Sequence, residues 1–282
     1  MLPIVVYTHS SYDVFLRMFL NSQIHACTQL TILTSLDHLD GEVFKNHKII
    51  HYDDRLPYAD RLISAFESIE DEWILFTHEI DIPVRFDYEF LLNALSLLQE
   101  LKGVRLNLQV SSGGTSVFHT ENGRTKNLFI NEALTGTTYL REVALDNSEL
   151  AKSQQIYRYN VNPAIINVPV FKRFLEDHTG FTYRDIEHIG SERWHLRERI
   201  FNLYNIKSVQ CGYFSCAPEY MFCHMTHFGM LSGIFLSGNQ FVNEQGQSMD
   251  AIVNDYLALL NRFKTRIPTQ FWGRLTHLTK TS

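Results

Sequence analysis

The sequence has few cysteines, no long apolar run and no surplus of basic residues, and each absence excludes a class of protein. Four of its 282 residues are cysteine, which excludes a disulfide-stapled miniprotein. No stretch approaches the ~20 apolar residues that a membrane-spanning helix needs. Lys and Arg number 25 and Asp and Glu 31, so the formal net charge is −6 and a nucleic-acid partner is not expected.

The remaining composition is typical of a folded, enzyme-sized protein. Apolar residues make up 45% and charged residues 20%, which excludes a disordered chain and a collagen-like fibre. Residues 1–7 form a short apolar run without a basic lead-in or a small-residue cleavage site, so we expect a strand there and no signal peptide. We therefore expect a cytoplasmic protein with free thiols.

The apolar pattern of the first hundred residues alternates between strand and helix. Compact apolar runs predict four strands, at residues 3–7, 30–33, 48–52 and 72–77. Apolar residues at helical spacing predict helices over residues 12–22 and 59–69. This order predicts an α/β fold, with a mostly parallel twisted sheet flanked by helices. Ligands bind at the carboxyl ends of the strands in such sheets, where the polar turns at residues 8–11 and 78–81 both fall.

The second half of the chain has a less regular pattern. Strands are predicted at residues 104–110 and 164–168, and a hairpin around the Asn122-Gly123 turn. Helices are predicted over residues 90–101, 169–177, 192–204 and 249–263. The third of these helices rests on the spacing of Leu196, Ile200 and Leu203.

The clearest chemical signal is an acidic pair, Glu79 and Asp81, directly after the fourth predicted strand. Two carboxylates at this spacing can both reach one divalent cation, and hard cations prefer carboxylate oxygens that they share with substrate phosphates. Such a cation would neutralise a diphosphate as it becomes a leaving group. The alternative is a solvated strand end at which acids happen to fall.

The order of these features resembles the GT-A family of nucleotide-sugar glycosyltransferases, of the bacterial or viral polysaccharide and O-antigen type. The resemblance covers about the first 110 residues. In that family the turn after the first strand holds the nucleotide, which implies that Thr8, His9 and Ser10 bind the nucleotide sugar. An Asp-x-Asp-like motif holds the metal and the diphosphate, which implies Mn²⁺ or Mg²⁺ at Asp81, with Glu79 at the first motif position.

The resemblance implies further ligands for the nucleotide sugar and the metal. Asp53 resembles the residue that accepts a hydrogen bond from the base, and Arg61 the basic residue that pairs with a motif carboxylate or a phosphate. The alternative for both is a surface ion pair. His224 and His227 fall where the family brings a late histidine back to the metal or the diphosphate. The alternative for these two is a place in the core.

The acceptor side shows a second resemblance, to bacterial sugar transferases, over residues 162–175. In inverting relatives an acid in the following segment deprotonates the acceptor hydroxyl, a general-base role. Glu187 is the first candidate for this catalytic role, Asp185 the second and Glu192 the third. Alternatively, these acids cap the helix predicted over residues 192–204.

We therefore expect a metal-assisted, inverting glycosyltransferase that moves a sugar from a nucleoside-diphosphate sugar to a hydroxyl of a glycan or lipid-linked glycan. Residues 1–110 would form the nucleotide-sugar-binding half of one domain, residues 111–248 its acceptor-side half, and residues 249–282 a C-terminal helix and a basic tail. The tail suits either peripheral contact with the inner face of a membrane or a solvated chain end.

Two alternatives remain from other functional classes. The first is a non-catalytic α/β protein that binds a nucleotide or a sugar and carries a degenerate metal motif. The second is a nucleotidyltransferase, which should carry a Gly-rich, basic loop after its first strand. Residues 8–11 are neither Gly-rich nor basic.

Overall fold

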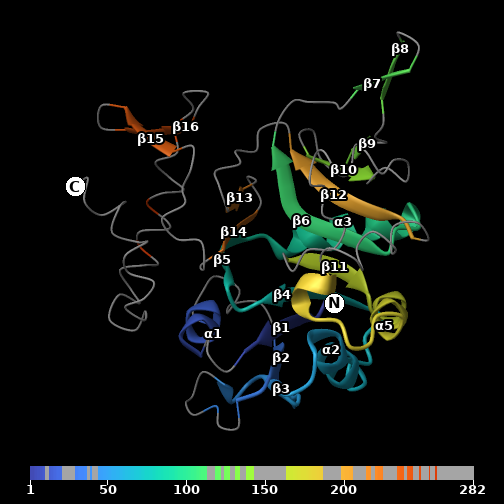
Figure 1. Ribbon diagram of the computed structural model, residues 1–282. Helices are drawn as coiled ribbons and strands as arrows, with labels where there is room; N and C mark the ends of the chain where they lie inside the picture. Colours follow the sequence, from blue (N-terminus) through green and yellow to red (C-terminus); the bar gives the residue numbers. More distant parts are fainter. Residues whose placement is uncertain are drawn as a thin grey trace.

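Most of the described strands belong to one twisted sheet (Figure 1). The computed structural model describes residues 1–9, 13–20, 29–36, 39, 44–112, 118–121, 124–127, 131–133, 138–142, 163–186, 198–205, 214–216, 220–224, 234–237 and 240–243, and the single residues 248, 254 and 258.

The first half of the chain builds four parallel strands. β1 spans Ile4–Thr8, β2 Leu30–Thr34, β3 Lys48–His51 and β4 Trp73–His78. Neighbouring strands are parallel in the order β3-β2-β1-β4. Helix α1 (Asp13–Leu20) lies between β1 and β2 along the chain, and α2 (Tyr58–Phe66) between β3 and β4. The strands and helices predicted in this half are confirmed, with ends that differ by a few residues.

The second half extends the same sheet. β11 (Ala164–Asn167) pairs antiparallel with β4 and with β6 (Arg105–Ser112), and β12 (Ile200–Asn205) pairs parallel with β6. β10 (Thr138–Glu142) and β9 (Asn131–Ala133) complete a nine-stranded sheet in the order β3-β2-β1-β4-β11-β6-β12-β10-β9. Within that sheet β11 and β10 run against the other strands. The predicted α/β fold with a mostly parallel sheet is confirmed.

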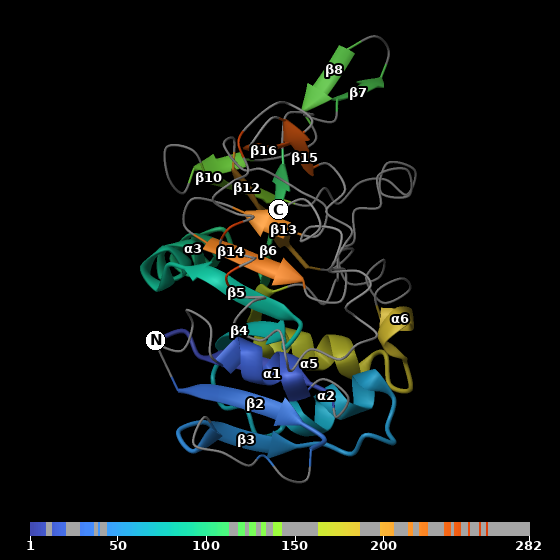
Figure 2. The ribbon, with the colours of Figure 1, turned by 90° about the vertical axis from the view of Figure 1, so that its left-hand side faces the viewer.

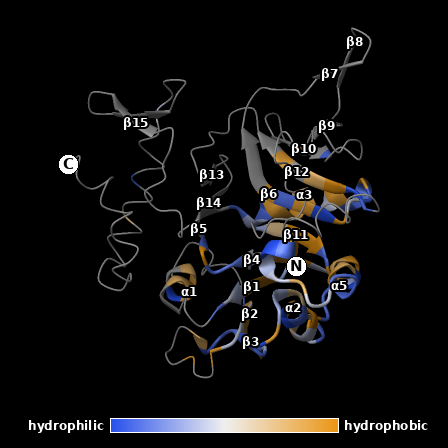
Figure 3. Cartoon of the chain, in the orientation of Figure 1, coloured by the Kyte–Doolittle hydropathy of each residue, from blue (hydrophilic) through white to orange (hydrophobic). Residues whose placement is uncertain are grey.

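Helices cover both faces of the sheet because its strands are apolar on both sides. In β1, Ile4 and Val6 pack into one core, and Val5 and Tyr7 into the other. α1 and α3 (Tyr88–Glu100) close the first core, and α2 and α5 (Val168–Glu176) close the second (Figure 2). Strands buried on both faces read as continuous apolar runs, as in parallel sheets generally. Figure 3 shows these hydrophobic residues along the helices and the central strands.

The helix predicted over residues 192–204 is wrong in its last part, which belongs to strand β12. Ile200 belongs to the buried cluster that α2 and α5 close, whereas Phe201 and Leu203 belong to the cluster that α1 and α3 close. Residues on opposite faces of one segment indicate a strand buried on both sides. A short apolar segment of this kind cannot be distinguished from a helix by spacing alone. Residues 191–197 lie outside the described part of the chain.

The other described strands form three small sheets. β5 (Asp81–Phe86) pairs antiparallel with β14 (Tyr220–His224), which pairs with β13 (Phe214–Cys216). β7 (Phe118–Glu121) and β8 (Arg124–Asn127) form the predicted hairpin, and β15 (Ile234–Ser237) and β16 (Gln240–Asn243) form another.

Two further expectations concern the predicted C-terminal helix and membrane-spanning helices. The helix predicted over residues 249–263 lies outside the described part except for residues 254 and 258. Within the described stretches, no helix has the length and apolar character needed to cross a membrane.

Gly103 permits close contact between the end of α3 and β12. A Cβ built there would overlap Leu98 Cδ1 and lie 2.8 Å from two ring carbons of Phe201. Because both neighbours are fully buried, Gly103→Ala is expected to lower the free energy of unfolding by about 1–3 kcal/mol through overpacking. Urea unfolding measures the loss. Asn93→Ala, on the exposed face of α3, is the control, and equal stability of the two variants would contradict this packing.

Candidate functional site

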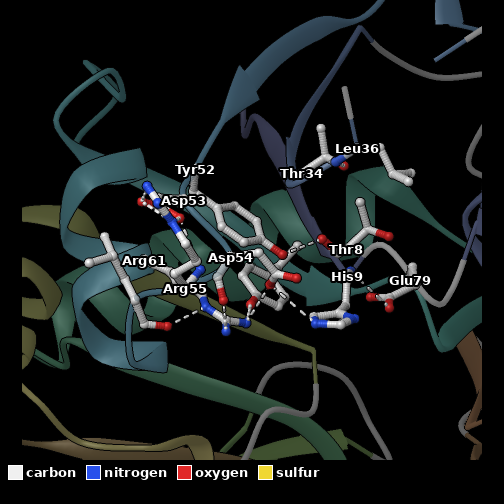
Figure 4. A network of polar contacts seen from close by, with 12 residues as sticks. Thr8, His9, Thr34, Leu36, Tyr52, Asp53, Asp54, Arg55, Arg61 and Glu79 are labelled. Carbon is white, nitrogen blue, oxygen red and sulfur yellow. Dashed lines mark hydrogen bonds and ion pairs between the residues drawn. The ribbon is translucent and has the colours of Figure 1, made fainter. Parts of the chain in front are cut away.

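The two polar turns predicted at the carboxyl edge of the sheet meet there. β1 and β4 are parallel neighbours with Tyr7 opposite His78, so the residues that follow these strands emerge at the same edge. The backbone N–H of Glu79 donates to the carbonyl of Tyr7 over 3.1 Å. The backbone N–H of His9 donates to Oε1 of Glu79 over 3.4 Å (Figure 4). The first acid of the motif therefore contacts the turn after β1 directly.

Both acids of the predicted metal site are buried, Glu79 at 3% exposure and Asp81 at 2%. Burial, reinforced by the charge of Asp81, raises the pKa of Glu79 to about 8 from an ordinary value of 4.5. Oε2 of Glu79 has no hydrogen-bond partner among the described residues. Glu79 is therefore mostly protonated at neutral pH when no cation is bound. A bound cation would take the place of that proton.

The strand that follows the acids brings a histidine position opposite the second acid. β5 begins at Asp81, which lies opposite His224 in the antiparallel pairing of β5 with β14. Opposed residues of antiparallel strands have Cβ atoms about 5 Å apart. The side chain of His224 and all of His227 lie outside the described part. Among the side chains that are described, no group of three or more His, Cys, Asp or Glu could hold a metal ion.

Arg61 of α2 pairs with an acid of the loop between β3 and α2. Its Nη1 lies 3.0 Å from Oδ1 of Asp54, and its Nη2 donates to the Asp54 carbonyl. Its Nε donates to the carbonyl of Leu56 over 2.6 Å. Nε2 of His9 lies 3.2 Å from the same Oδ1 of Asp54 (Figure 4). Asp54 thus joins the helix to the turn after β1, a link that sequence analysis missed.

Asp53, the residue predicted to recognise the base, forms an ion pair at the surface. Its side chain is 39% exposed, and Oδ2 lies 2.7 Å from Nη2 of Arg55. Hydrogen bonds from Arg55 lower the pKa of Asp53 to about 2. The contact with the base stays a prediction.

Aromatic side chains pack next to this edge of the sheet, and the sequence analysis did not identify them. Tyr7 stacks on Tyr52 with ring centroids 5.1 Å apart, and the Tyr52 hydroxyl donates to the carbonyl of Thr8 over 2.6 Å. Burial raises the pKa of both tyrosines, so both are neutral at physiological pH. The hydroxyl of Tyr58 lies 3.1 Å from Nε2 of His78. The signal in the sequence was Tyr52, directly before Asp53. The apolar pattern identified Tyr52 only as the last residue of a predicted strand.

The segment with the candidate bases begins next to this aromatic cluster. The ring of Tyr183, the first residue of α6 (Tyr183–Asp185), packs edge-on against Tyr58 with centroids 5.7 Å apart. Asp185 belongs to a capping box with Thr182, in which its Oδ2 accepts from the Thr182 N–H and hydroxyl over 3.1 and 2.6 Å. The capping alternative therefore holds for Asp185, although the helix it caps is α6.

The remaining predicted residues have different outcomes. Thr8 is fully buried, and its carbonyl accepts a hydrogen bond from the Tyr52 hydroxyl; its contact with the nucleotide sugar stays a prediction. Ser10, Glu187 and Glu192 lie outside the described part of the chain. Their roles stay predictions.

No protein-family model and no curated protein matches the sequence. Among solved structures, the fold is similar to the bifunctional IspDF from Campylobacter jejuni, with 11% identity and a TM-score of 0.39 over 72% of this chain and 49% of that one. It is also similar to UDP-glucose pyrophosphorylase, apo and complexed with UDP-glucose, with 11% identity and a TM-score of 0.41 over 73% of this chain and 91% of that one. The chain spans about half the length of IspDF. Similarity at this level carries no argument about activity.

The burial of Glu79 predicts a pH-dependent stability. Because its pKa is raised from 4.5 to about 8, the folded state binds this proton more tightly than the unfolded state between these values. The free energy of unfolding should be highest below about pH 4.5 and should fall as the pH rises from there through about 8. The total loss should reach up to about 5 kcal/mol, at about 1.4 kcal/mol per pKa unit. Glu79→Gln cannot ionise, so it should lack this loss.

Thermal unfolding at pH 5 and pH 9, in the presence of a chelator, measures the difference. Glu89→Gln, on the exposed face of α3, is the control and should follow the wild type. If Glu79→Gln loses as much stability as the control between the two pH values, Glu79 is not the buried acid described above.

Proposed function

We propose that the chain is a GT-A-type glycosyltransferase that moves a sugar from a nucleoside-diphosphate sugar to a hydroxyl of a glycan acceptor. The observation that carries this proposal is the buried acidic pair Glu79 and Asp81 at the carboxyl edge of the sheet, in contact with the turn after β1. Ligands of α/β sheets bind at this edge. Burying two carboxylates two residues apart is costly unless they are paired or coordinate a metal ion.

The donor atoms at the edge suit a hard divalent cation, Mn²⁺ or Mg²⁺. Oε2 of Glu79 is buried and lacks a hydrogen-bond partner among the described residues, and Asp81 is a second buried carboxylate. Asp81 and Glu79 would hold the ion, and His224 has the register position from which a third ligand could come. When bound, the cation would neutralise the diphosphate of the donor.

Side-chain contacts connect this edge to the start of the segment that carries the candidate bases. His78 directly precedes Glu79 and contacts Tyr58, whose ring supports Tyr183 at the start of the acidic segment. Asp185 is already engaged in the cap of α6, where it accepts two hydrogen bonds from Thr182. Glu187 is therefore our first candidate for the base that activates the acceptor hydroxyl by single displacement.

A non-catalytic nucleotide- or sugar-binding protein is the second candidate. Glu79 favours it, because a motif that begins with glutamate and is protonated at neutral pH needs a cation with enough affinity to displace the proton. The two candidates differ in turnover, since only the enzyme would split a donor.

Release of nucleoside diphosphate from a panel of UDP- and GDP-sugars, with and without Mn²⁺, tests the proposal. Asp81→Asn keeps the size of the side chain and removes its charge, so metal-dependent release should fall by at least about 100-fold. Asp71→Asn, on the exposed surface before β4, is the control and should keep full activity. Nucleotide binding without turnover of any donor would favour the binding protein, and full activity of Asp81→Asn would contradict the metal site.

A further inference from the structure

Asp54 and His9 come together from different parts of the chain. His9 follows β1, and Asp54 lies in the loop between β3 and α2. The imidazole Nε2 lies 3.2 Å from Oδ1 of Asp54, and about a third of each side chain is exposed, 35% for His9 and 36% for Asp54. The pair therefore sits at the rim of the carboxyl edge, within reach of a ligand.

Two neighbouring aspartates of this loop have different partners. Asp53 pairs with Arg55 at the surface, whereas Asp54 contacts both His9 and Arg61 (Figure 4). Asp54 therefore connects the turn after β1 to helix α2 at the edge of the candidate site.

Arg61 holds the Asp54 carboxylate in this orientation. Besides its contacts with the Oδ1 and carbonyl of Asp54, its guanidinium donates to the carbonyl of Leu56 and to the hydroxyl of Tyr7, the latter over 3.4 Å. The side chain of Arg61 is only 18% exposed. Arg61 also balances the charge of Asp54, so the carboxylate adds no net negative charge next to a phosphate.

The other end of His9 is tied to the acidic motif. Its backbone N–H donates to Glu79, so the residue links Asp54 on one side to the proposed cation site on the other. Partly exposed ion pairs contribute little to the stability of a fold. The arrangement accordingly orders one side chain without adding much to folding.

We propose that Asp54, held by Arg61, is a positioning residue that orients the imidazole of His9 toward the diphosphate of a bound nucleotide. This inference rests on the proposed function, because it takes the ligand to be a nucleoside diphosphate. Because Nε2 faces Asp54, Nδ1 is the ring nitrogen left for a phosphate oxygen, and it can donate to that oxygen when the imidazole carries both of its protons. A fixed side chain also loses less entropy on binding than a mobile one.

Calorimetric titration of UDP and of GDP, each with Mn²⁺, tests the inference in four proteins: wild type, Asp54→Asn, His9→Ala and the double variant. Asp54→Asn should weaken binding of the accepted nucleotide about tenfold. In the His9→Ala background the same change should have almost no further effect, because Asp54 acts through His9. Asp71→Asn is again the control and should bind like the wild type.

Nitrogen-15 NMR of the histidine side chains supplies a readout that loss of stability would not move. The His9 signal, assigned with His9→Ala, should shift in Asp54→Asn and stay in place in Asp53→Asn. The unfolding temperature of Asp54→Asn should stay close to that of the wild type.

Additive losses in the double variant, or an unchanged His9 signal in Asp54→Asn, would overturn the positioning role while the proposed function stands. If the wild type binds neither nucleotide, the proposed function fails and this inference fails with it. Weaker binding together with a shifted His9 signal and no further loss in the double variant supports the inference.

Discussion

The burial of two carboxylates within two residues of each other is the constraint on which the candidate site depends. Glu79 and Asp81 follow β4 at the carboxyl edge of a parallel sheet, a position that strand order alone assigns to ligands. In the absence of a cation, the fold accommodates the pair by keeping a proton on Glu79. Under the function proposed above, a divalent cation would replace that proton.

The rest of the edge is built around this pair by contacts between distant segments. The turn after β1 supplies His9, the loop after β3 supplies Asp54, and α2 supplies Arg61 and Tyr58. Through Tyr58 the same network reaches Tyr183 and the segment that carries the candidate bases. Chemistry at the acidic pair and chemistry at the acceptor would therefore share one connected network of side chains.

Sequence patterns predicted the parts of this architecture that depend on local periodicity. The four parallel strands are visible in the sequence as apolar runs, and the acidic pair lies in the polar turn after the fourth run. Parallel pairing of β1 with β4 brings the turns after these two strands together. β12 was mistaken for the end of a helix because a short apolar segment has no unambiguous period. The contact of Asp54 with His9 could not be predicted, because Asp53 and Asp54 occupy one loop and the contact depends on where the folded helix places Arg61.

The most direct test of the central claim is a crystal structure of the protein soaked with Mn²⁺ and a nucleoside diphosphate, with the anomalous signal of manganese recorded. We expect an anomalous peak within about 2.5 Å of carboxylate oxygens of Glu79 and Asp81, with phosphate oxygens completing the coordination of the manganese. A nucleotide bound elsewhere, or a manganese peak that touches neither carboxylate, would contradict the central claim.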